Sequence, residues 1–544
     1  MGKLMFEKFN VLISCEGNAV PTVPALKRFA NYAKSLGFTG MLLNMETMYH
    51  IEDEPYFGYM RGRYTKEEIR ELEEYCNEKG ITLMPCIQTL GHYYFLGKYA
   101  TYNDYMDNLE VLLIDDERTY ALIEKMFKTI SEYFTTRYIN IGMDEAFGMG
   151  LGKFLSRYGY QDRFDLMTRH LKRVLSIAEK YGFTCEMWSD MFINHVLTEE
   201  FLSKPKEEVR EAVKDKMPQN VTISHWSYID LDKEKLTREL HNHFKLTDNV
   251  SFTGALLKWF GFAPDNARTI TSLKMNMKTA KECGVKSYNL GLWADWGGEA
   301  SWFSILPSLF FASEYAHGNA TCLEDLDKDK FKSLTGVDFD VFMLVDKPNK
   351  PHFDERYKEP NSKCVFYLYN DLLYEVFGGD FISENTGTDY QKSAKLLLEA
   401  DGGEYGYILQ TMGRLCAALA LKTELGKKLK SAYERGDKTA IKRIADEIIP
   451  ETIARVRVFF DAFEQQWRKE NKPFGFETQC QRIGGLIYRM EYVTKRLQEY
   501  VDGKVADIPE LQEKRLKPNV FRDNPTEDDY LMFGWNHIVA NGWI

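Results

Sequence analysis

The stretch that decides the fold is Tyr138-Ile-Asn-Ile-Gly-Met-Asp-Glu-Ala-Phe-Gly-Met-Gly-Leu-Gly-Lys153. Its first residues predict a short apolar strand that ends near Gly142, and a glycine-rich turn then leads into a helix. Two adjacent carboxylates, Asp144 and Glu145, follow the strand directly. Since side chains alternate between the two faces of a strand, both acids can serve one site only if the regular pleat ends here. An α/β enzyme places its chemistry in such loops, so the stretch predicts an active site just after this strand.

The same order of a short apolar strand and an amphipathic helix recurs over the first 300 residues. Strands are predicted at 10–14, 39–45, 81–88, 138–142, 183–188, 221–226, 250–254 and 287–293. Helices are predicted at 24–36, 65–79, 116–134, 161–181 and 267–283, and several end in a glycine before the next strand, namely Gly37, Gly80, Gly182 and Gly284. A doubly wound sheet could give the same alternation. The total of eight strands favours a closed (β/α)8 TIM barrel.

The pattern changes after the predicted barrel. A closing helix is expected at 301–317, and from 335 to 544 long helices replace the strands. We therefore divide the chain into a (β/α)8 catalytic barrel at 1–334 and a mainly α-helical C-terminal domain at 335–544. The expected role of the second domain is structural, and it is compatible with a homodimer. The apolar tail from Phe533 to Ile544 is expected to dock against folded protein.

Composition excludes several classes of partner. The chain has 544 residues and a formal net charge of −11, so it offers no basic face for nucleic acid or anionic lipid. No segment reaches the roughly 18 apolar residues of a membrane span, and the N-terminus lacks a secretion signal. The nine cysteines are scattered and include no Cys-x-x-Cys pair, which indicates free thiols. These features predict a cytoplasmic protein.

Polar and tryptophan side chains recur at the predicted strand ends. In chain order they are Glu16, Asn44, Glu46, Gln88, His92, Asp144, Glu145, Trp188, Asp190, Trp226, Tyr228, Lys258, Trp259, Trp293, Asp295, Trp296 and Glu299. Because the carboxyl ends of barrel strands meet at one face, we expect these side chains to line one site. A single tryptophan at a strand end more often packs than binds, but several strand ends carry one here. Carboxylates with tryptophans indicate a pocket that stacks on a sugar and moves protons, with Glu145 as proton donor.

Competing chemistries lack their motifs. The run Gly148-Met-Gly-Leu-Gly-Lys153 is similar to a phosphate loop, but Phe147 replaces its first glycine and Phe154 replaces the magnesium-binding Ser or Thr. No zinc cluster and no Gly-x-Ser-x-Gly elbow occur. His241-Asn-His243 is expected on a polar surface rather than at a metal. We therefore expect no metal site.

The strand ends resemble glycoside hydrolase family 20, the β-N-acetylhexosaminidases. Gly142-Met-Asp-Glu145 matches the Gly-x-Asp-Glu motif after strand four, and Leu90-Gly-His92 is similar to the Pro-Gly-His turn after strand three. Trp188 and Trp226 match the tryptophans that end strands five and six, and Trp293-Ala-Asp295 resembles the Trp-x-Glu after strand eight. The pattern is nearest to the divergent intracellular bacterial branch that carries a helical C-terminal domain.

The resemblance implies substrate-assisted retaining hydrolysis, in which the substrate's own acetamido oxygen attacks the anomeric carbon. Asp144 would accept the acetamido N–H, and Glu145 would protonate the leaving oxygen and then deprotonate water. Glu145 is expected in apolar, partly desolvated surroundings that raise its pKa. Trp188, Trp226 and Trp293 would wall the sugar pocket. No organic cofactor is implied.

Two departures from the family pattern affect the substrate-binding residues. The arginine that the family places after strand one is absent, since the chain has Ser14-Cys15-Glu16-Gly17. Glu16 could bind hydroxyl groups instead, and Arg61 or Arg63 could reach in. The family's acetamido-binding tyrosine near strand seven has no clear counterpart, so Tyr228 is taken as its substitute and Trp259 as another pocket residue. The preference between gluco and galacto sugars stays open.

The sequence thus favours an exo-β-N-acetylhexosaminidase that removes terminal GlcNAc or GalNAc from short oligosaccharides or glycoconjugates. Two alternatives remain at this point. One is a barrel glycosidase with a protein carboxylate as nucleophile. The other is a non-catalytic sugar-binding barrel with an inert acid pair.

Overall fold

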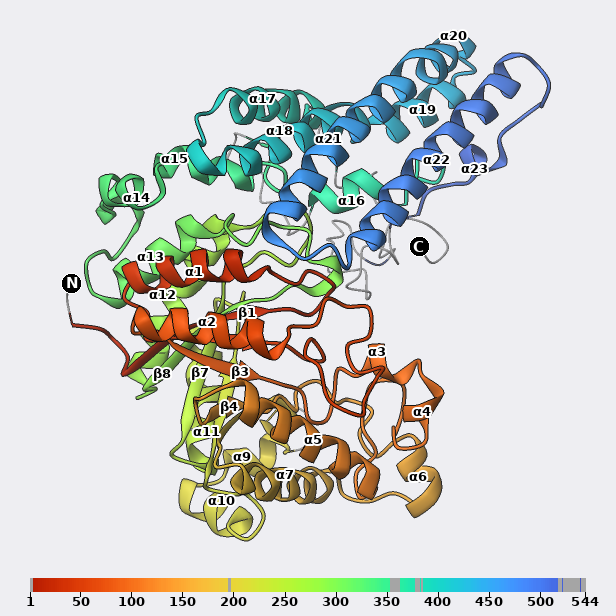
Figure 1. Ribbon diagram of the computed structural model, residues 1–544. Coiled ribbons are helices and arrows are strands. Elements are labelled where there is room, and N and C mark those ends of the chain that lie inside the picture. The colour runs from red at the N-terminus through yellow and green to blue at the C-terminus, as the bar shows by residue number, and fades with distance from the viewer. Residues whose placement is uncertain are drawn as a thin grey trace. The chain divides into compact units, whose positions relative to one another are not determined.

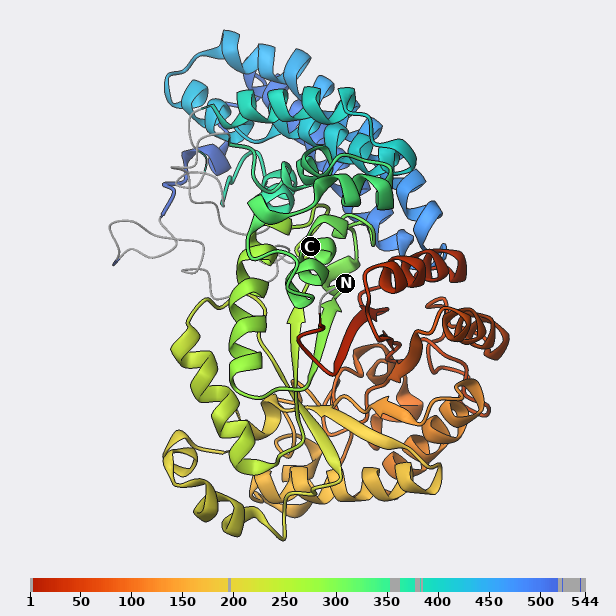
Figure 2. The ribbon, with the colours of Figure 1, turned by 90° about the vertical axis from the view of Figure 1, so that its left-hand side faces the viewer.

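Eight parallel strands form a closed barrel in which each strand pairs with the next and β8 pairs with β1. The strands are β1 (Lys8–Ser14), β2 (Gly40–Asn44), β3 (Thr82–Cys86), β4 (Tyr138–Asn140), β5 (Thr184–Trp188), β6 (Val221–Trp226), β7 (Val250–Ala255) and β8 (Ser287–Leu292). Figures 1 and 2 show the strands with helices on their outer side. All eight predicted strands are present, and the predicted (β/α)8 fold is confirmed.

The structure is a computed structural model that describes residues 3–193, 197–352, 363–376, 382, 385–516, 521 and 539. The chain divides into two compact units. The first contains Met1–Leu257, Arg268–Trp293 and Ser308–Leu326, and therefore all eight strands. The second contains Lys258–Ala267, Ala294–Pro307 and Asp327–Ile544. The predicted domain boundary at residue 334 stays a prediction.

Helices connect the strands of the barrel. The longer ones are α1 (Val23–Ser35), α2 (Lys66–Glu78), α5 (Glu117–Tyr133), α7 (Arg163–Lys180), α11 (Lys233–Leu246), α12 (Asn266–Glu282) and α13 (Leu306–Ala316). Short helices lie in the connections, namely α3 (Tyr94–Gly97), α4 (Ala100–Asn103), α6 (Lys153–Tyr158), α8 (Asp190–Ile193), α9 (Glu199–Ser203) and α10 (Lys206–Val213). The four glycines predicted to end helices all have positive φ, between 70° and 91°.

Side-chain caps define where these helices begin. In α2, Thr65 Oγ1 accepts from the Glu68 N–H at 3.2 Å and Glu68 Oε2 accepts from the Thr65 N–H at 2.9 Å, which completes a capping box. Thr22 caps α1, and Asp116 caps α5. Each cap satisfies backbone donors at a point where an apolar strand must turn back along the outside of the barrel.

The barrel interior includes a polar layer below the strand ends. Glu186 of β5 is buried, and its carboxylate accepts hydrogen bonds from Ser251, from the Tyr138 hydroxyl at 3.0 Å and from Asn289 Nδ2 at 3.4 Å. Burial raises the pKa of Glu186, and these donors offset part of that shift. Because residues two apart on a strand point to the same side, Trp188 lies one layer closer to the carboxyl ends. This hydrogen-bonded layer therefore closes the barrel interior beneath the candidate site.

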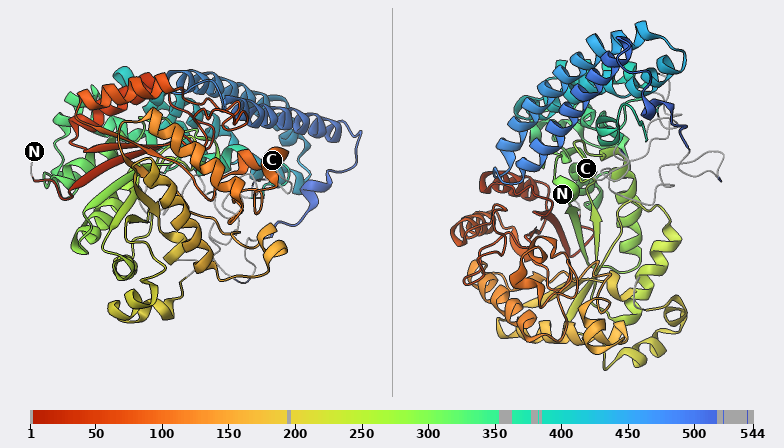
Figure 3. Two further views of the ribbon diagram at one scale, coloured as in Figure 1. Left: turned by 60° about the horizontal axis from the view of Figure 1, so that its bottom comes forward. Right: turned by 90° about the vertical axis from the view of Figure 1, so that its right-hand side faces the viewer.

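The second unit is helical in its described part. Its helices are α14 (Lys328–Thr335), α15 (Phe339–Phe342), α16 (Lys363–Tyr369), α17 (Thr386–Glu399), α18 (Gly406–Lys422), α19 (Leu425–Glu434), α20 (Lys438–Arg443), α21 (Ile449–Glu470), α22 (Phe476–Val501) and α23 (Pro509–Gln512). Figure 3 shows α21 and α22 side by side, and the rings of Phe463 and Trp467 on α21 lie 5.7 and 5.5 Å from Phe476 at the start of α22. The predicted helical C-terminal region is confirmed.

Two further expectations concern the surface of the chain. The apolar tail from Phe533 to Ile544 lies outside the described residues apart from Val539, so its predicted docking stays a prediction. Among the helices within the described ranges, none is both long and apolar enough to cross a membrane.

Candidate active site

The backbone leaves the regular strand conformation just before the acid pair. Gly142, Met143 and Glu145 have φ values of +72°, +75° and +50°. A Cβ atom at Gly142 would come within 2.0 Å of the Gln88 side chain, so only glycine fits this position. The alternation of strand side chains ends here, and Asp144 and Glu145 project toward one site rather than to opposite faces.

Asp144 is held between two polar side chains that follow β3. Its Oδ1 accepts from Gln88 Nε2 at 2.9 Å, and its Oδ2 lies 3.2 Å from His92 Nε2. Burial alone would raise the pKa of Asp144, but the charge of His92 and both hydrogen bonds outweigh it and lower the pKa. Burial alone would lower the pKa of His92, but Asp144 outweighs it and holds the pKa well above 6.5. The two groups therefore form an ion pair at neutral pH.

Glu145 is oriented through its backbone and exposed at its side chain. Its N–H donates to Asp190 Oδ2 at 2.9 Å, and Asp190 Oδ1 accepts from Trp226 Nε1 at 3.4 Å. Burial, and then the charge of Asp144, raise the pKa of Asp190 to about 7. The Glu145 carboxylate lies 3.8 Å from His92 Nε2 and is 44% exposed. The Glu145 side chain is therefore more exposed than the apolar, partly desolvated surroundings that were expected for it, and it lies beside the charged His92.

Four aromatic side chains form a continuous wall from β5 through β6 to β8. The ring of buried Trp188 meets that of Trp293 edge-on at 5.8 Å. Trp226 and Tyr228 stack at 5.1 Å with planes 19° apart, and Tyr228 lies 6.1 Å from Trp293. Such a wall offers flat apolar faces of the kind that pack against a pyranose ring.

Charged side chains after β1 and β2 lie on another side of the site. The carboxylates of Glu46 and Glu16 are both buried, and after Asp144 they contribute to the raised pKa of His92. Arg61 is buried with its Nη1 3.6 Å from Glu46 Oε2, whereas Arg63 donates to a carbonyl in its own loop. Of the two arginines that could reach the site, Arg61 is the one that lies among these carboxylates.

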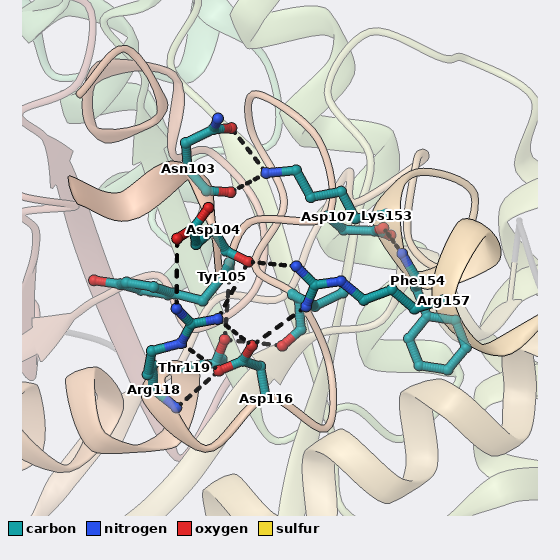
Figure 4. Close-up of polar contacts among 11 residues, drawn as sticks. Asn103, Asp104, Tyr105, Asp107, Asp116, Arg118, Thr119, Lys153, Phe154 and Arg157 are labelled. Atoms are coloured by element: carbon teal, nitrogen blue, oxygen red, sulfur yellow. Dashed lines mark hydrogen bonds and ion pairs between the residues drawn. The ribbon is translucent and has the colours of Figure 1, made fainter. Parts of the chain in front are cut away.

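The glycine-rich turn after the acid pair encloses a carboxylate that belongs to the protein. The buried Asp107 accepts from the N–H groups of Gly150 and Phe154, each at 2.7 Å. A Cβ atom at Gly152 would come within 2.1 Å of the Asp107 carbonyl oxygen. Figure 4 shows Asp107 beside Lys153 and Phe154. The turn thus uses its amide groups to bind Asp107, and it positions the loop that carries Glu145.

One group of three side chains in the described part of the chain could hold a metal ion. Ligand atoms of His92, Asp144 and Glu145 all lie within 4.8 Å of one another. Because Asp144 holds the pKa of His92 well above 6.5, His92 is protonated at neutral pH and has no lone pair for a metal ion. The trio is therefore better suited to moving protons than to binding a cation.

Comparison with protein families assigns both parts of the chain. Residues 19–253 match the catalytic domain of glycosyl hydrolase family 20, and residues 340–529 match the Glycoside Hydrolase 20C C-terminal domain. The chain belongs to glycoside hydrolase family 20. It is therefore a glycoside hydrolase, and the predicted family resemblance is confirmed.

Individual relatives of this family 20 chain are distant. Hexosaminidase D of Bos taurus is 26% identical over 256 residues, which cover 44% of this chain and 67% of the relative. The β-hexosaminidase subunit beta of Mus musculus is 27% identical over 148 residues, or 24% of this chain and 28% of the relative. The β-N-acetylhexosaminidase of Bacteroides fragilis superposes with a TM-score of 0.46 at 15% identity, over 61% of this chain and 71% of that one.

Most of the predicted site residues lie in the barrel unit of this family 20 chain. The structure brings together His92, Asp144, Glu145, Trp188, Trp226, Tyr228 and Trp293, and the charge of Glu16 acts on His92. Trp259 and Asp295 belong to the second unit, so their place in the site stays a prediction.

Three residues make positioning contacts that the sequence did not assign to them. Gln88 and Asp190 were expected at the site as strand-end residues, but they were given no role there because an amide and a third carboxylate carry no motif of their own. Asp107 lies in the long connection between β3 and α5. The only sequence feature that could have indicated its role is the glycine run around Gly150, whose backbone it binds 43 residues further along the chain.

The ion pair of His92 and Asp144 predicts a pH-dependent effect of His92→Gln on stability. The raised pKa of His92 stabilises the fold below its unfolded pKa of about 6.5, and the lowered pKa of Asp144 stabilises it above its unfolded pKa of about 4. The side chains of His92 and Asp144 are 25% and 15% exposed, so solvent partly screens the interaction between them. We expect His92→Gln to lower the free energy of unfolding by about 1–2 kcal/mol between these limits, and by less as the pH rises further.

Urea unfolding at pH 5.5 and pH 9 measures this difference. His241, an exposed histidine on α11, provides the control variant His241→Gln, which should have the stability of the wild type at both pH values. A deficit of His92→Gln that is as large at pH 9 as at pH 5.5 would show that the ion pair does not cause it.

Proposed function

We propose that this chain is an exo-β-N-acetylhexosaminidase that removes terminal β-linked GlcNAc or GalNAc by substrate-assisted retaining hydrolysis. The observation that carries the proposal is the different setting of two adjacent acids. Asp144 is ionised, partly buried and fixed by Gln88 and His92. The Glu145 side chain is 44% exposed and lies 3.8 Å from His92 Nε2, and its backbone N–H donates to Asp190 Oδ2.

These settings fit the two tasks of an acetamido-assisted reaction. A fixed carboxylate with remaining lone pairs can accept the acetamido N–H, turn the acetamido oxygen toward the anomeric carbon and stabilise the positive charge that develops. An exposed acid beside it can protonate the leaving oxygen and later take a proton from water that enters from solvent. Asp144 has the first role and Glu145 has the second.

The aromatic wall supports a sugar as the ligand between these groups. The indole N–H of buried Trp293 has no hydrogen-bond partner among the described residues, so a sugar oxygen in the pocket would satisfy it. Glu16, Glu46 and Arg61 provide charged partners for hydroxyl groups on another side of the site. The names of the bovine and murine relatives, hexosaminidase D and β-hexosaminidase, agree with this substrate class.

Hydrolysis of 4-nitrophenyl β-GlcNAc, β-GalNAc and β-glucose by the purified protein tests the proposal. We expect turnover of both N-acetyl sugars and a kcat/KM for the glucoside at least about 10³-fold lower, because the glucoside lacks the internal nucleophile. Similar rates for glucoside and N-acetyl sugars would indicate a protein carboxylate as nucleophile. No turnover of any of them, with GlcNAc still bound, would indicate a sugar-binding barrel.

A further inference from the structure

Most exposed large apolar side chains of the barrel unit lie in three loops, those that follow β2, β3 and β4. Within the described residues of that unit, every exposed large apolar side chain lies in a connection that follows a strand, and most follow β2, β3 or β4. The aromatic ones are Tyr56, Tyr59, Tyr94, Phe147, Tyr158 and Tyr160. Scattered apolar residues are normal on a surface, but a concentration at the catalytic face marks a binding surface.

Aromatic contacts connect the loops after β2 and β3. The rings of Tyr56 and Tyr99 stack at 4.6 Å, and the Tyr102 hydroxyl donates to Glu54 at 2.8 Å. The guanidinium of Arg61 lies 3.3 Å from the centre of the Phe95 ring. These contacts hold the two loops in one arrangement.

Ion pairs and hydrogen bonds connect the loops after β3 and β4, as Figure 4 shows. Lys153 of α6 donates to Asn103 Oδ1 at 2.9 Å. Arg157 donates to the Asp104 carbonyl oxygen at 3.1 Å and lies 3.6 Å from Asp116. Together with the turn around Asp107, these contacts make the three loops one preorganised surface, which we name the aromatic shelf (residues 46–64, 87–115 and 143–162).

The aromatic shelf begins directly beside the proposed proton donor. Phe147 stands two residues after Glu145, and its N–H donates to the Glu145 carbonyl oxygen at 2.7 Å in a tight turn. Tyr94 stands two residues after His92. Phe147 and Tyr94 are 48% and 62% exposed. Because Glu145 protonates the leaving oxygen, whatever is attached to that oxygen must extend from this point.

The geometry points to the aromatic shelf as a binding site for the leaving-group side of the substrate, with Phe147 and Tyr94 stacking on the pyranose units that follow the cleaved bond. This inference rests on the proposed function, and it makes the preferred substrate an oligosaccharide rather than a glycoside with a small aglycone.

The chemistry of the shelf favours a carbohydrate chain over other occupants. Flat rings suit the apolar face of a pyranose, and the nearby Glu110 carboxylate, whose charge helps to raise the pKa of Tyr94 after burial, offers a polar group to sugar hydroxyls at the ring's edge. A lipid surface is a poor match because the chain carries a net charge of −11 and biological membranes are anionic.

Binding calorimetry in the Glu145→Gln background tests the inference without any need for turnover. We expect a β-linked GlcNAc trisaccharide to bind at least about tenfold more tightly than GlcNAc alone, because stacking adds to its affinity. Adding Phe147→Ala or Tyr94→Ala should remove most of this advantage and leave the affinity for GlcNAc within about twofold. The control is Tyr488→Ala, which removes an exposed aromatic ring from α22 of the second unit and should change neither affinity.

Three outcomes would overturn the inference. Equal affinity for monosaccharide and trisaccharide would show that the shelf binds no sugar. Equal losses for both ligands in the Phe147 and Tyr94 variants would show that these rings only support Glu145. Self-association that Phe147→Ala abolishes, with trisaccharide binding intact, would make the shelf a subunit interface. If the Phe147 and Tyr94 variants lose the tighter binding of the trisaccharide but the wild-type protein hydrolyses no substrate, the aromatic shelf is a sugar-binding site and the proposed function is rejected.

Discussion

Glu145→Gln is expected to lower kcat/KM for a β-linked GlcNAc disaccharide by about 10³-fold or more, because the amide can neither donate nor accept the proton that the leaving oxygen requires. The substitution keeps the size of the side chain, and the hydrogen bond from the backbone N–H to Asp190 does not depend on it. The loss should be smaller for 4-nitrophenyl β-GlcNAc, whose leaving group departs without protonation. Comparing the two substrates in steady-state assays measures this difference.

The chain offers a matched control for this prediction. Asp116-Glu117 is a second pair of adjacent acids, in which Asp116 caps α5 and Glu117 forms an exposed ion pair with Arg173 at 2.8 Å. Glu117→Gln should leave kcat/KM within about twofold on both substrates. If Glu145→Gln impairs the disaccharide and the nitrophenyl glycoside equally, Glu145 is not the proton donor in the first step.

The barrel could be predicted because its signals are local. Each strand is a short apolar run, and each glycine that ends a helix stands beside the strand that follows it, as Gly182 does before β5. The acid pair was also predictable, since Gly142 and the two acids are consecutive. Their convergence on His92 follows from a backbone break that the adjacent glycine indicates.

The remaining features depend on contacts between distant residues. Asp107 binds the backbone of the glycine-rich turn, which lies 43 residues further along the chain. No repeating pattern in the sequence links these two positions. Apolar, partly desolvated surroundings were expected for Glu145 because its role as proton donor requires a raised pKa. The positive φ of Glu145 turns its side chain toward solvent instead. A one-dimensional pattern reports which residue types are near the end of a strand, but the direction of each side chain is set by backbone angles after the strand has ended.

Asp144→Asn is expected to lower kcat/KM for N-acetyl substrates by about 10²–10³-fold, because it removes the charge that orients the acetamido group and stabilises the positive intermediate. The Asn amide also presents its NH2 group to Gln88 Nε2 or His92 Nε2, where the carboxylate accepts hydrogen bonds. One of these donors therefore loses its acceptor. Since Asp144 holds the pKa of His92 well above 6.5, that pKa should fall in the variant, which NMR titration of the imidazole can follow.

A thiazoline analogue of the cyclic intermediate separates this role from a general loss of activity. Its affinity should fall about 10²-fold in Asp144→Asn, because the analogue resembles the transition state that Asp144 stabilises. Glu145→Gln should retain most of that affinity, since Glu145 acts on the leaving oxygen, which the analogue lacks. Unchanged thiazoline affinity in Asp144→Asn would reject Asp144 as the acetamido partner. An equal loss in both variants would assign the two acids a single shared role, and the different settings of an ionised, fixed Asp144 and an exposed Glu145 argue against that outcome.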